Sequence, residues 1–171
     1  MKKTILSIAI VLLTTAGSFA QRIAFVDTDY ILKQIPEYID AQKKVDELSA
    51  QWEKDIQTKY TEIDLLYKKY QAEQVLLTEE MRQQRQKEIV DKETAVKDFQ
   101  KEKFGYNGEL FQKRQELIKP IQDRVYDEVQ KLATSKSYNI ILDKSSANIL
   151  YGDEKYDLSD EVLKSLGVTP K

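Results

Sequence analysis

The sequence of 171 residues has no cysteine and no histidine. Without cysteine, the chain has no disulfide bridge, no thiolate nucleophile and no cysteine-linked lipid anchor. Without histidine as well, it lacks the commonest general base and the usual zinc ligands. No glycine-rich phosphate loop is present either. We therefore expect a protein that is not an enzyme, with no catalytic residue, no cofactor and no resident metal.

Carboxylates are plentiful, so a calcium site is the one metal site to consider. The candidate groups are Asp27 with Asp29, and Asp153 with Glu154 and Asp157. Their spacing lacks the regular pattern of a calcium loop, and short acidic residues favour helix caps and turns in any case. We interpret these acids as caps and turns.

The chain also has no apolar run long enough to span a membrane. Its N-terminal run, Ile5 to Leu13, follows Lys2 and Lys3 and precedes small residues at Ser18 and Ala20. This arrangement predicts a secretory signal peptide over residues 1–20, with cleavage after Ala20. A retained N-terminal anchor is the alternative, which the interrupted apolar run disfavours.

A strong excess of one charge is missing too. The chain carries 27 basic and 29 acidic residues, and removal of Lys2 and Lys3 with the signal leaves a net charge of −4. A mildly acidic chain in which both charges are interspersed lacks the basic patch that is typical of nucleic-acid-binding proteins. Its polar faces also differ from the lysine-rich face of a helix that lies on anionic lipid. We expect no nucleic-acid partner.

What the chain does have is a long segment, residues 37–136, with an apolar residue at every third or fourth position. This spacing predicts helices. The apolar residues form only a narrow stripe, here called the seam, which is typical of two helices packed as a coiled coil. The seam of the first half consists of Val45, Leu48, Trp52, Ile56, Tyr60, Ile63, Leu66 or Tyr67, and Tyr70. The seam of the second half consists of Ile89, Val96, Phe99, Phe104, Leu110 or Phe111, Leu117 or Ile118, Ile121, Val125, Val129 and Leu132.

The apolar seam is interrupted between the two halves, where Met81 is the only strongly apolar residue between Leu77 and Glu88. Thr78, followed by two glutamates, is typical of a helix N-cap with acids in the first turn. We therefore predict an antiparallel hairpin that reverses near residues 75–78, with an arm about 60 Å long at 1.5 Å per residue. One uninterrupted rod is the alternative.

Strand-like segments lie at the two ends of the mature chain. Residues 22–27 and 138–143 are short apolar runs that predict strands buried on both faces, and residues 148–151 predict a third strand. Asp27 or Thr28 is expected to cap a short helix that Pro36 ends or redirects, and Ser159 to cap a last helix that Gly167 stops. The predicted fold class is α+β, mostly α.

The predicted organisation is a small β-body with a long helical arm inserted into it. The body comprises residues 21–36 and 137–171, and the arm comprises residues 37–136. Three short strands are marginal alone and expose two edges, so we expect a homo-oligomer that pairs these edges. The expected oligomerisation residues are Ile23, Phe25, Val26, Ile140, Ile141, Leu142, Ile149 and Leu150.

Two glycines and a proline interrupt the returning half of the arm. Gly105 and Gly108 lie in a predicted helical run, where each costs about 1 kcal/mol relative to alanine. Pro120 removes a helix hydrogen bond a few turns later. We expect these residues to form a hinge that lets the arm open. A static kink that fits the arm to the body is the alternative.

The two ends of the mature chain together resemble the Skp/OmpH family of periplasmic chaperones. The segments that carry the resemblance are Ile23 to Asp27 directly after a signal, the helical insertion, Tyr138 to Asp143, and Asp157 to Lys164. The resemblance implies a periplasmic homotrimer with three helical-hairpin arms around a cavity that holds unfolded outer-membrane proteins without ATP. Well-known members are strongly basic, whereas this chain is acidic, which argues against electrostatic attraction to a membrane or to lipopolysaccharide.

A chaperone of this kind needs apolar contact area without a fixed pocket. Aromatic side chains off the seam would supply it, since they offer a large area with little side-chain entropy to lose. The candidate client-binding residues are Tyr67, Phe104, Tyr106 and Phe111; the alternative is that they pack within the arm or the body. A structural or scaffolding coiled coil of the cell envelope is the other candidate function.

Overall fold

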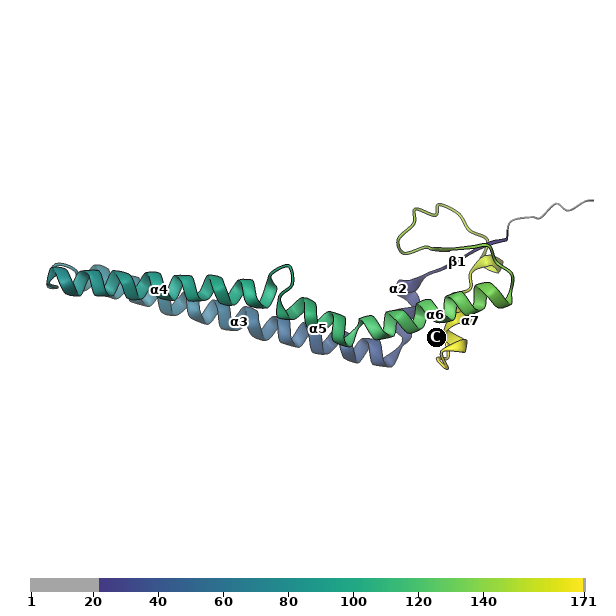
Figure 1. Ribbon diagram of the computed structural model, residues 1–171, viewed down its shortest axis with the longest axis horizontal. Helices are drawn as coiled ribbons and strands as arrows, with labels where there is room; N and C mark the ends of the chain where they lie inside the picture. The colour runs from purple at the N-terminus through teal and green to yellow at the C-terminus, as the bar shows by residue number, and fades with distance from the viewer. Residues whose placement is uncertain (1–21, 171) are drawn as a thin grey trace, which may run out of the picture.

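The computed structural model describes residues 22–170 of the chain. The predicted signal peptide, residues 1–20, and its cleavage site lie outside the described residues. The described chain has two parts, a long helical rod and a small body at one end of it (Figure 1). The predicted α+β class, with short strands near the chain ends and an antiparallel helical hairpin inserted between them, is confirmed.

Helices make up most of the described chain. The elements in order are β1 (Ile23–Val26), α2 (Thr28–Gln34), α3 (Pro36–Glu73), α4 (Glu79–Phe104), α5 (Glu109–Leu117), α6 (Lys119–Ser135), β2 (Ile140–Asp143), the 3₁₀ turn η1 (Glu154–Tyr156) and α7 (Ser159–Ser165).

The outgoing half of the arm is the single 38-residue helix α3. Pro36 lies in its first turn, where a missing backbone N–H costs nothing, so this proline redirects the chain from α2 into α3. The chain reverses after Glu73. Thr78 then caps α4 by accepting a hydrogen bond from the Met81 amide, and α4 runs back along α3 (Figure 1).

The returning half of the arm consists of three helices. Helix α4 ends at Phe104, and the loop 105–108 stands out from the rod before α5 begins (Figure 1). The prediction that Gly105 and Gly108 lie within one helical run is therefore wrong: the helix stops and restarts. Pro120 lies in the first turn of α6, where the helix is interrupted at Ile118.

The body contains a two-stranded sheet. Strands β1 and β2 are parallel, with Ile23 opposite Ile140 and Val26 opposite Asp143. The connection between the strands is the whole arm. The first strand is buried along most of its length, but β2 is half exposed, so the prediction of burial on both faces is wrong for β2.

The predicted third strand, residues 148–151 with Ile149 and Leu150, is not a strand. Strand β1 already pairs with β2, and its other side is occupied by Asp157, which forms an isolated bridge with Phe25. The amide of Leu158 donates to the Phe25 carbonyl at 2.9 Å. No open edge of β1 is left for residues 148–151, because a strand needs a partner with unpaired backbone groups.

Helices α2 and α7 pack between the sheet of the body and the part of the arm next to it. Their buried side chains join those of β1, α3 and α6 in one core; those contributed by α2 and α7 include Ile31, Leu32, Val162 and Leu163. Gly167 stops α7 as predicted: its φ is +77°, its amide bonds Lys164, and the Val168 amide bonds the Leu163 carbonyl.

Ser159 does not cap α7, contrary to the prediction. Its side chain is buried, donates to Asp157 Oδ1 at 2.6 Å and accepts from the Asp27 amide at 2.8 Å. The Ser159 amide itself donates to Asp157 Oδ1 at 2.9 Å. Ser159 therefore links the start of α7 to the end of β1. Asp27, in turn, caps α2 by accepting from the Tyr30 amide at 2.9 Å.

Candidate functional site

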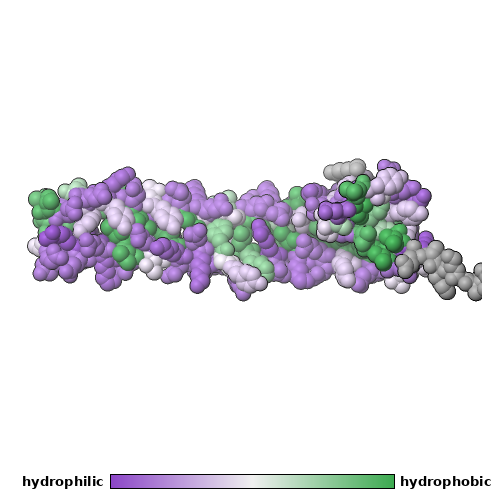
Figure 2. Space-filling model, turned by 90° about the horizontal axis from the view of Figure 1, so that it is seen from above, coloured by the Kyte–Doolittle hydropathy of each residue, from purple (hydrophilic) through white to green (hydrophobic). Residues whose placement is uncertain are grey.

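The distal arm is held by a narrow seam between α3 and α4. Ile63, Ile89 and Val96 are buried there, and Ile56, Leu66 and Tyr70 pack against them. So thin a seam leaves most of each helix facing solvent. The surface of the rod is largely hydrophilic, with hydrophobic atoms gathered at its far end, in patches along it and over the body (Figure 2).

The four aromatic residues predicted to bind clients lie in different environments in the structure. Tyr106 is 94% exposed, in the loop between α4 and α5, and Phe111 is exposed on α5. Tyr67 is partly exposed, and its hydroxyl donates to Glu93 Oε1 at 3.0 Å across the hairpin. That hydrogen bond raises the pKa of Tyr67. Phe104, by contrast, packs within the arm.

Phe104 forms an edge-to-face pair with Trp52, with ring centroids 6.1 Å apart and planes at 89°. Lys103 belongs to the same cluster, since its ammonium lies over the Trp52 ring and over the Phe99 ring. The seam prediction included Trp52, Phe99 and Phe104, but sequence reasoning missed their association with Lys103. No signal in the linear sequence distinguishes this lysine from its neighbours.

Sequence reasoning also missed the aliphatic residues at the tip of the arm. Val75 and Leu76 are each 84% exposed in the turn between α3 and α4. Their position beyond the last seam residue was a signal that could have identified them. The arm therefore presents apolar side chains at its tip, at the loop 105–108 and on α5.

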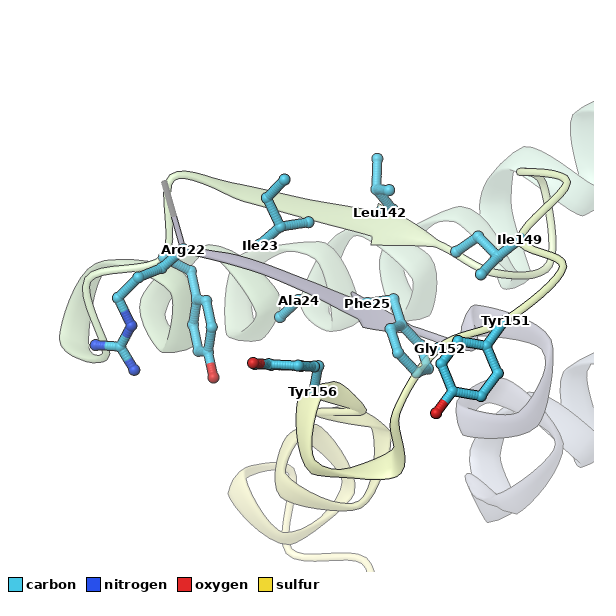
Figure 3. Close-up of a pocket in the computed structure, with 10 residues that line it drawn as sticks. Arg22, Ile23, Ala24, Phe25, Leu142, Ile149, Tyr151, Gly152 and Tyr156 are labelled. Carbon is cyan, nitrogen blue, oxygen red and sulfur yellow. The ribbon is translucent and has the colours of Figure 1, made fainter. Parts of the chain in front are cut away.

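A second apolar surface lies on the body. A hollow of about 640 Å³ opens beside the sheet, with Ile23 and Leu142 on the strands and Ile149, Tyr151 and Tyr156 around it (Figure 3). Gly152 packs so closely on Phe25 that a Cβ at this position would lie 2.5 Å from the ring. The segment 148–152 therefore covers Phe25 instead of extending the sheet.

The residues predicted for oligomerisation fall into two groups. Phe25 and Val26 are buried within the single chain and Ile141 packs against the core, so these three help to hold β1 in place. The exposed or partly exposed members are Ile23, Ile140, Leu142, Ile149 and Leu150. These five apolar side chains lie on or next to the exposed sheet.

The charges of the arm are mostly paired along the helices. Asp64 with Lys68 and Lys87 with Asp91 are examples at i and i+4, where exposed pairs contribute a few tenths of a kcal/mol each. The acids considered for calcium have local partners: Asp27 caps α2, and Asp153 caps η1. Among residues 22–170, no group of three or more acidic side chains is placed to hold a metal ion.

One carboxylate of the body, that of Asp143, accepts several hydrogen bonds. Asp143, at the end of β2, accepts hydrogen bonds from the backbone and side chain of Thr28 and of Ser145. Its partial burial raises the pKa of Asp143, but these hydrogen bonds stabilise the carboxylate, and the pKa is lowered on balance. This carboxylate thus connects β2 to the first residue of α2.

These features define a class of protein with a small sheet-containing body and one long antiparallel helical arm. A family model described as outer membrane protein (OmpH-like) matches residues 22–166. The chain belongs to the OmpH-like family. In the part that the structure describes, none of the helices is both long and apolar enough to cross a membrane.

The chain is also similar to two individual proteins. An uncharacterized protein of Aquifex aeolicus (strain VF5) is 29% identical over 158 residues, which cover 92% of this chain and 93% of the relative. A crystal structure of an OmpH-like protein from Caulobacter crescentus CB15, described as a candidate outer membrane chaperone, has a TM-score of 0.67 and 12% identity, covering 89% of this chain and 87% of that one. The second comparison establishes a shared fold.

Proposed function

We propose that the protein is an ATP-independent holdase chaperone of the periplasm that binds unfolded outer-membrane proteins and prevents their aggregation. Membership of the OmpH-like family supports this function, and the structurally similar protein from Caulobacter crescentus CB15 is described as a candidate outer membrane chaperone. The predicted signal peptide supports export.

The observation that carries the proposal is the apolar surface of the arm outside its own seam. Tyr106, Phe111, Val75 and Leu76 are exposed on a rod whose surface is largely hydrophilic (Figure 2). Scattered apolar side chains of this kind contact many sequences weakly, which suits clients that share no sequence. Weak contacts also release without chemistry, so no nucleotide is needed.

The proposed assembly is a homotrimer built on the bodies, with the three arms around a shared cavity. The exposed apolar residues of the sheet, such as Ile23 and Ile140, support association of bodies, because an exposed apolar sheet surface is unfavourable in water. Association would fix three arm bases close together. The arms would then enclose a client from several sides, which increases its effective affinity.

A scaffolding coiled coil of the envelope is less well supported. Such a spacer would be expected to continue its self-satisfied seam through the tip. Here the apolar residues of the tip, Val75 and Leu76, are 84% exposed instead of packed.

The test is to dilute a urea-denatured outer-membrane barrel protein into the purified chain at a stoichiometric ratio, without ATP, and to follow light scattering. We expect the barrel protein to stay soluble. A matched variant has Tyr106 and Phe111 replaced by serine; because both side chains are exposed, it should lose suppression of aggregation while its thermal unfolding is unchanged. Failure of the unmodified chain to suppress aggregation at any ratio would overturn the proposal.

A further inference from the structure

The returning half of the arm is divided into two helical segments by the loop 105–108. The backbone hydrogen bonds through this region are Gly105 N to Lys101 O at 2.8 Å, Gly108 N to Gly105 O at 2.9 Å, and Gln112 N to Gly108 O at 3.1 Å. The first ends α4, the second closes the loop, and the third begins α5. None of these three bonds joins α4 directly to α5.

The two glycines do not provide free rotation. A Cβ on Gly105 would lie 2.3 Å from the Lys101 carbonyl oxygen, and one on Gly108 would lie 2.7 Å from the Glu102 carbonyl oxygen. Both residues have negative φ, so the glycines are required for close backbone approach and not for an unusual conformation. The backbone at both glycines therefore passes close to carbonyl oxygens in the last turn of α4, although the loop as a whole stands out from the rod.

One side chain connects the segments across this loop. Lys103, in the last turn of α4, has a side chain only 13% exposed. Its ammonium donates to Glu102 Oε1 at 2.8 Å and forms an ion pair with Glu109, the first residue of α5. The hydrogen bonds to Glu102 and Glu109 raise the pKa of Lys103, so it stays charged at neutral pH.

The same ammonium also reaches the outgoing helix. It lies 5.4 Å from the centroid of Trp52 on α3 and 5.3 Å from that of Phe99 on α4. A cation over an aromatic face is attracted by the ring, and more strongly where water is excluded. Lys103 thus contacts groups from α3, α4 and α5 at the place where the backbone of the returning half is interrupted.

We propose that Lys103 holds α4 and α5 in a fixed arrangement on α3. Breaking its contacts to Glu109 and Trp52 would then let the part of the arm beyond the loop 105–108 move relative to the part next to the body. This inference rests on the arm and not on the client, so it stands independently of the proposed function. It assigns the control of arm stiffness to a side chain instead of to the glycines.

The test compares Lys103→Met and Glu109→Gln with the unmodified protein by residue-resolved hydrogen exchange. We expect the amides of Gly108 and Gln112 to exchange about tenfold faster in both variants, while those of the seam around Ile63 and Ile89 are unchanged. Since Trp52 is the only tryptophan, its fluorescence should change in Lys103→Met.

Two controls distinguish this role of Lys103 from a general destabilisation of the arm. Lys101→Met removes an exposed lysine from the same helical turn and should leave exchange and fluorescence unchanged. Lys103→Arg keeps a cation and should restore protection at Gly108 and Gln112 to near that of the unmodified protein. Faster exchange spread evenly along the whole arm in Lys103→Met, or no change at Gly108 and Gln112, would overturn the proposal. Client binding is not measured, so this result is separable from that of the aggregation test.

Discussion

Thr28 and Asp143 are 115 residues apart in the sequence, yet the Thr28 hydroxyl donates to Asp143 Oδ2 at 2.8 Å. The Thr28 amide donates to the other carboxylate oxygen at 3.2 Å. The segment that leads into the arm is thereby fixed to the strand that follows the arm. The body thus holds both ends of a long helical insertion in one place.

Asp143→Asn should weaken this connection. The amide keeps one acceptor but loses the charge that strengthens four hydrogen bonds, so we expect a loss of about 1 kcal/mol in the free energy of unfolding at neutral pH. Because the pKa of Asp143 is lowered in the folded protein, its contribution is complete above the ordinary value of 3.8 and is lost as the pH falls through the folded pKa.

Denaturant unfolding of both proteins between neutral and acid pH measures this effect. The difference between the unmodified protein and Asp143→Asn should shrink as the pH falls below 3.8. Asp98→Asn, which changes an exposed acid on α4, is the control and should show no such trend. A difference that stays constant down to acid pH would contradict the role of the Asp143 charge.

Replacing the loop glycines tests the sequence prediction of a hinge. Gly105→Ala and Gly108→Ala should each destabilise the arm by roughly 1–3 kcal/mol, because a Cβ would overlap the carbonyl oxygens of α4. Asn107→Ala, in the same loop, is the control. The hinge prediction requires that the double alanine variant also accepts a narrower range of client sizes; an unchanged range would leave a static break that fits the arm to the body.

Substitutions of packed and of exposed aromatic residues should affect different properties of the protein. Phe104→Ser removes the edge-to-face pair with Trp52, which contributes about 0.5–1.5 kcal/mol beyond area burial, and should lower the melting temperature. Tyr106→Ser and Phe111→Ser should leave it unchanged but reduce suppression of client aggregation. Thermal unfolding and light scattering on the same samples make the comparison. Equal losses of both properties in Tyr106→Ser would assign that residue to packing.

Oligomer formation can be tested on the exposed sheet. Ile140→Glu places a charge opposite Ile23, in the apolar surface proposed to join the bodies. We expect the sedimentation mass to fall from that of a trimer to that of a monomer, because an unpaired charge is costly to bury. Val90→Glu makes the same change at an exposed position on α4 and should leave the mass unchanged. A folded monomer of the unmodified chain at micromolar concentration would contradict the trimer.

The hairpin could be predicted because its determinants are local. Seam residues such as Ile63 and Ile89 recur with the helical period, and Thr78 needs only the amide of Met81 three residues away to cap α4. The end of α7 at Gly167 was predictable for the same reason. These signals depend on neighbours within one or two helical turns.

The third strand and the fate of the aromatic residues could not be predicted in this way. Residues 148–151 have a strand-like composition, but the following Gly152 packs against the Phe25 ring, and the segment covers that ring instead of joining the sheet. Phe104 and Phe111 lie on opposite sides of a four-residue loop that interrupts the helix. Counting at 3.6 residues per turn does not carry across such an interruption, so the period alone could not show that Phe104 packs on Trp52 while Phe111 is exposed.

The sequence by itself determined the long hairpin arm and the β-forming character of the two chain ends, since helix periodicity, caps and turn residues are encoded over a few positions. Only the tertiary structure decided the parallel pairing of β1 with β2, the covering of Phe25 by residues 148–152, and the burial of Lys103 against Trp52 and Glu109. Each of these brings together groups from distant segments, and their contacts depend on where whole helices end and how they pack.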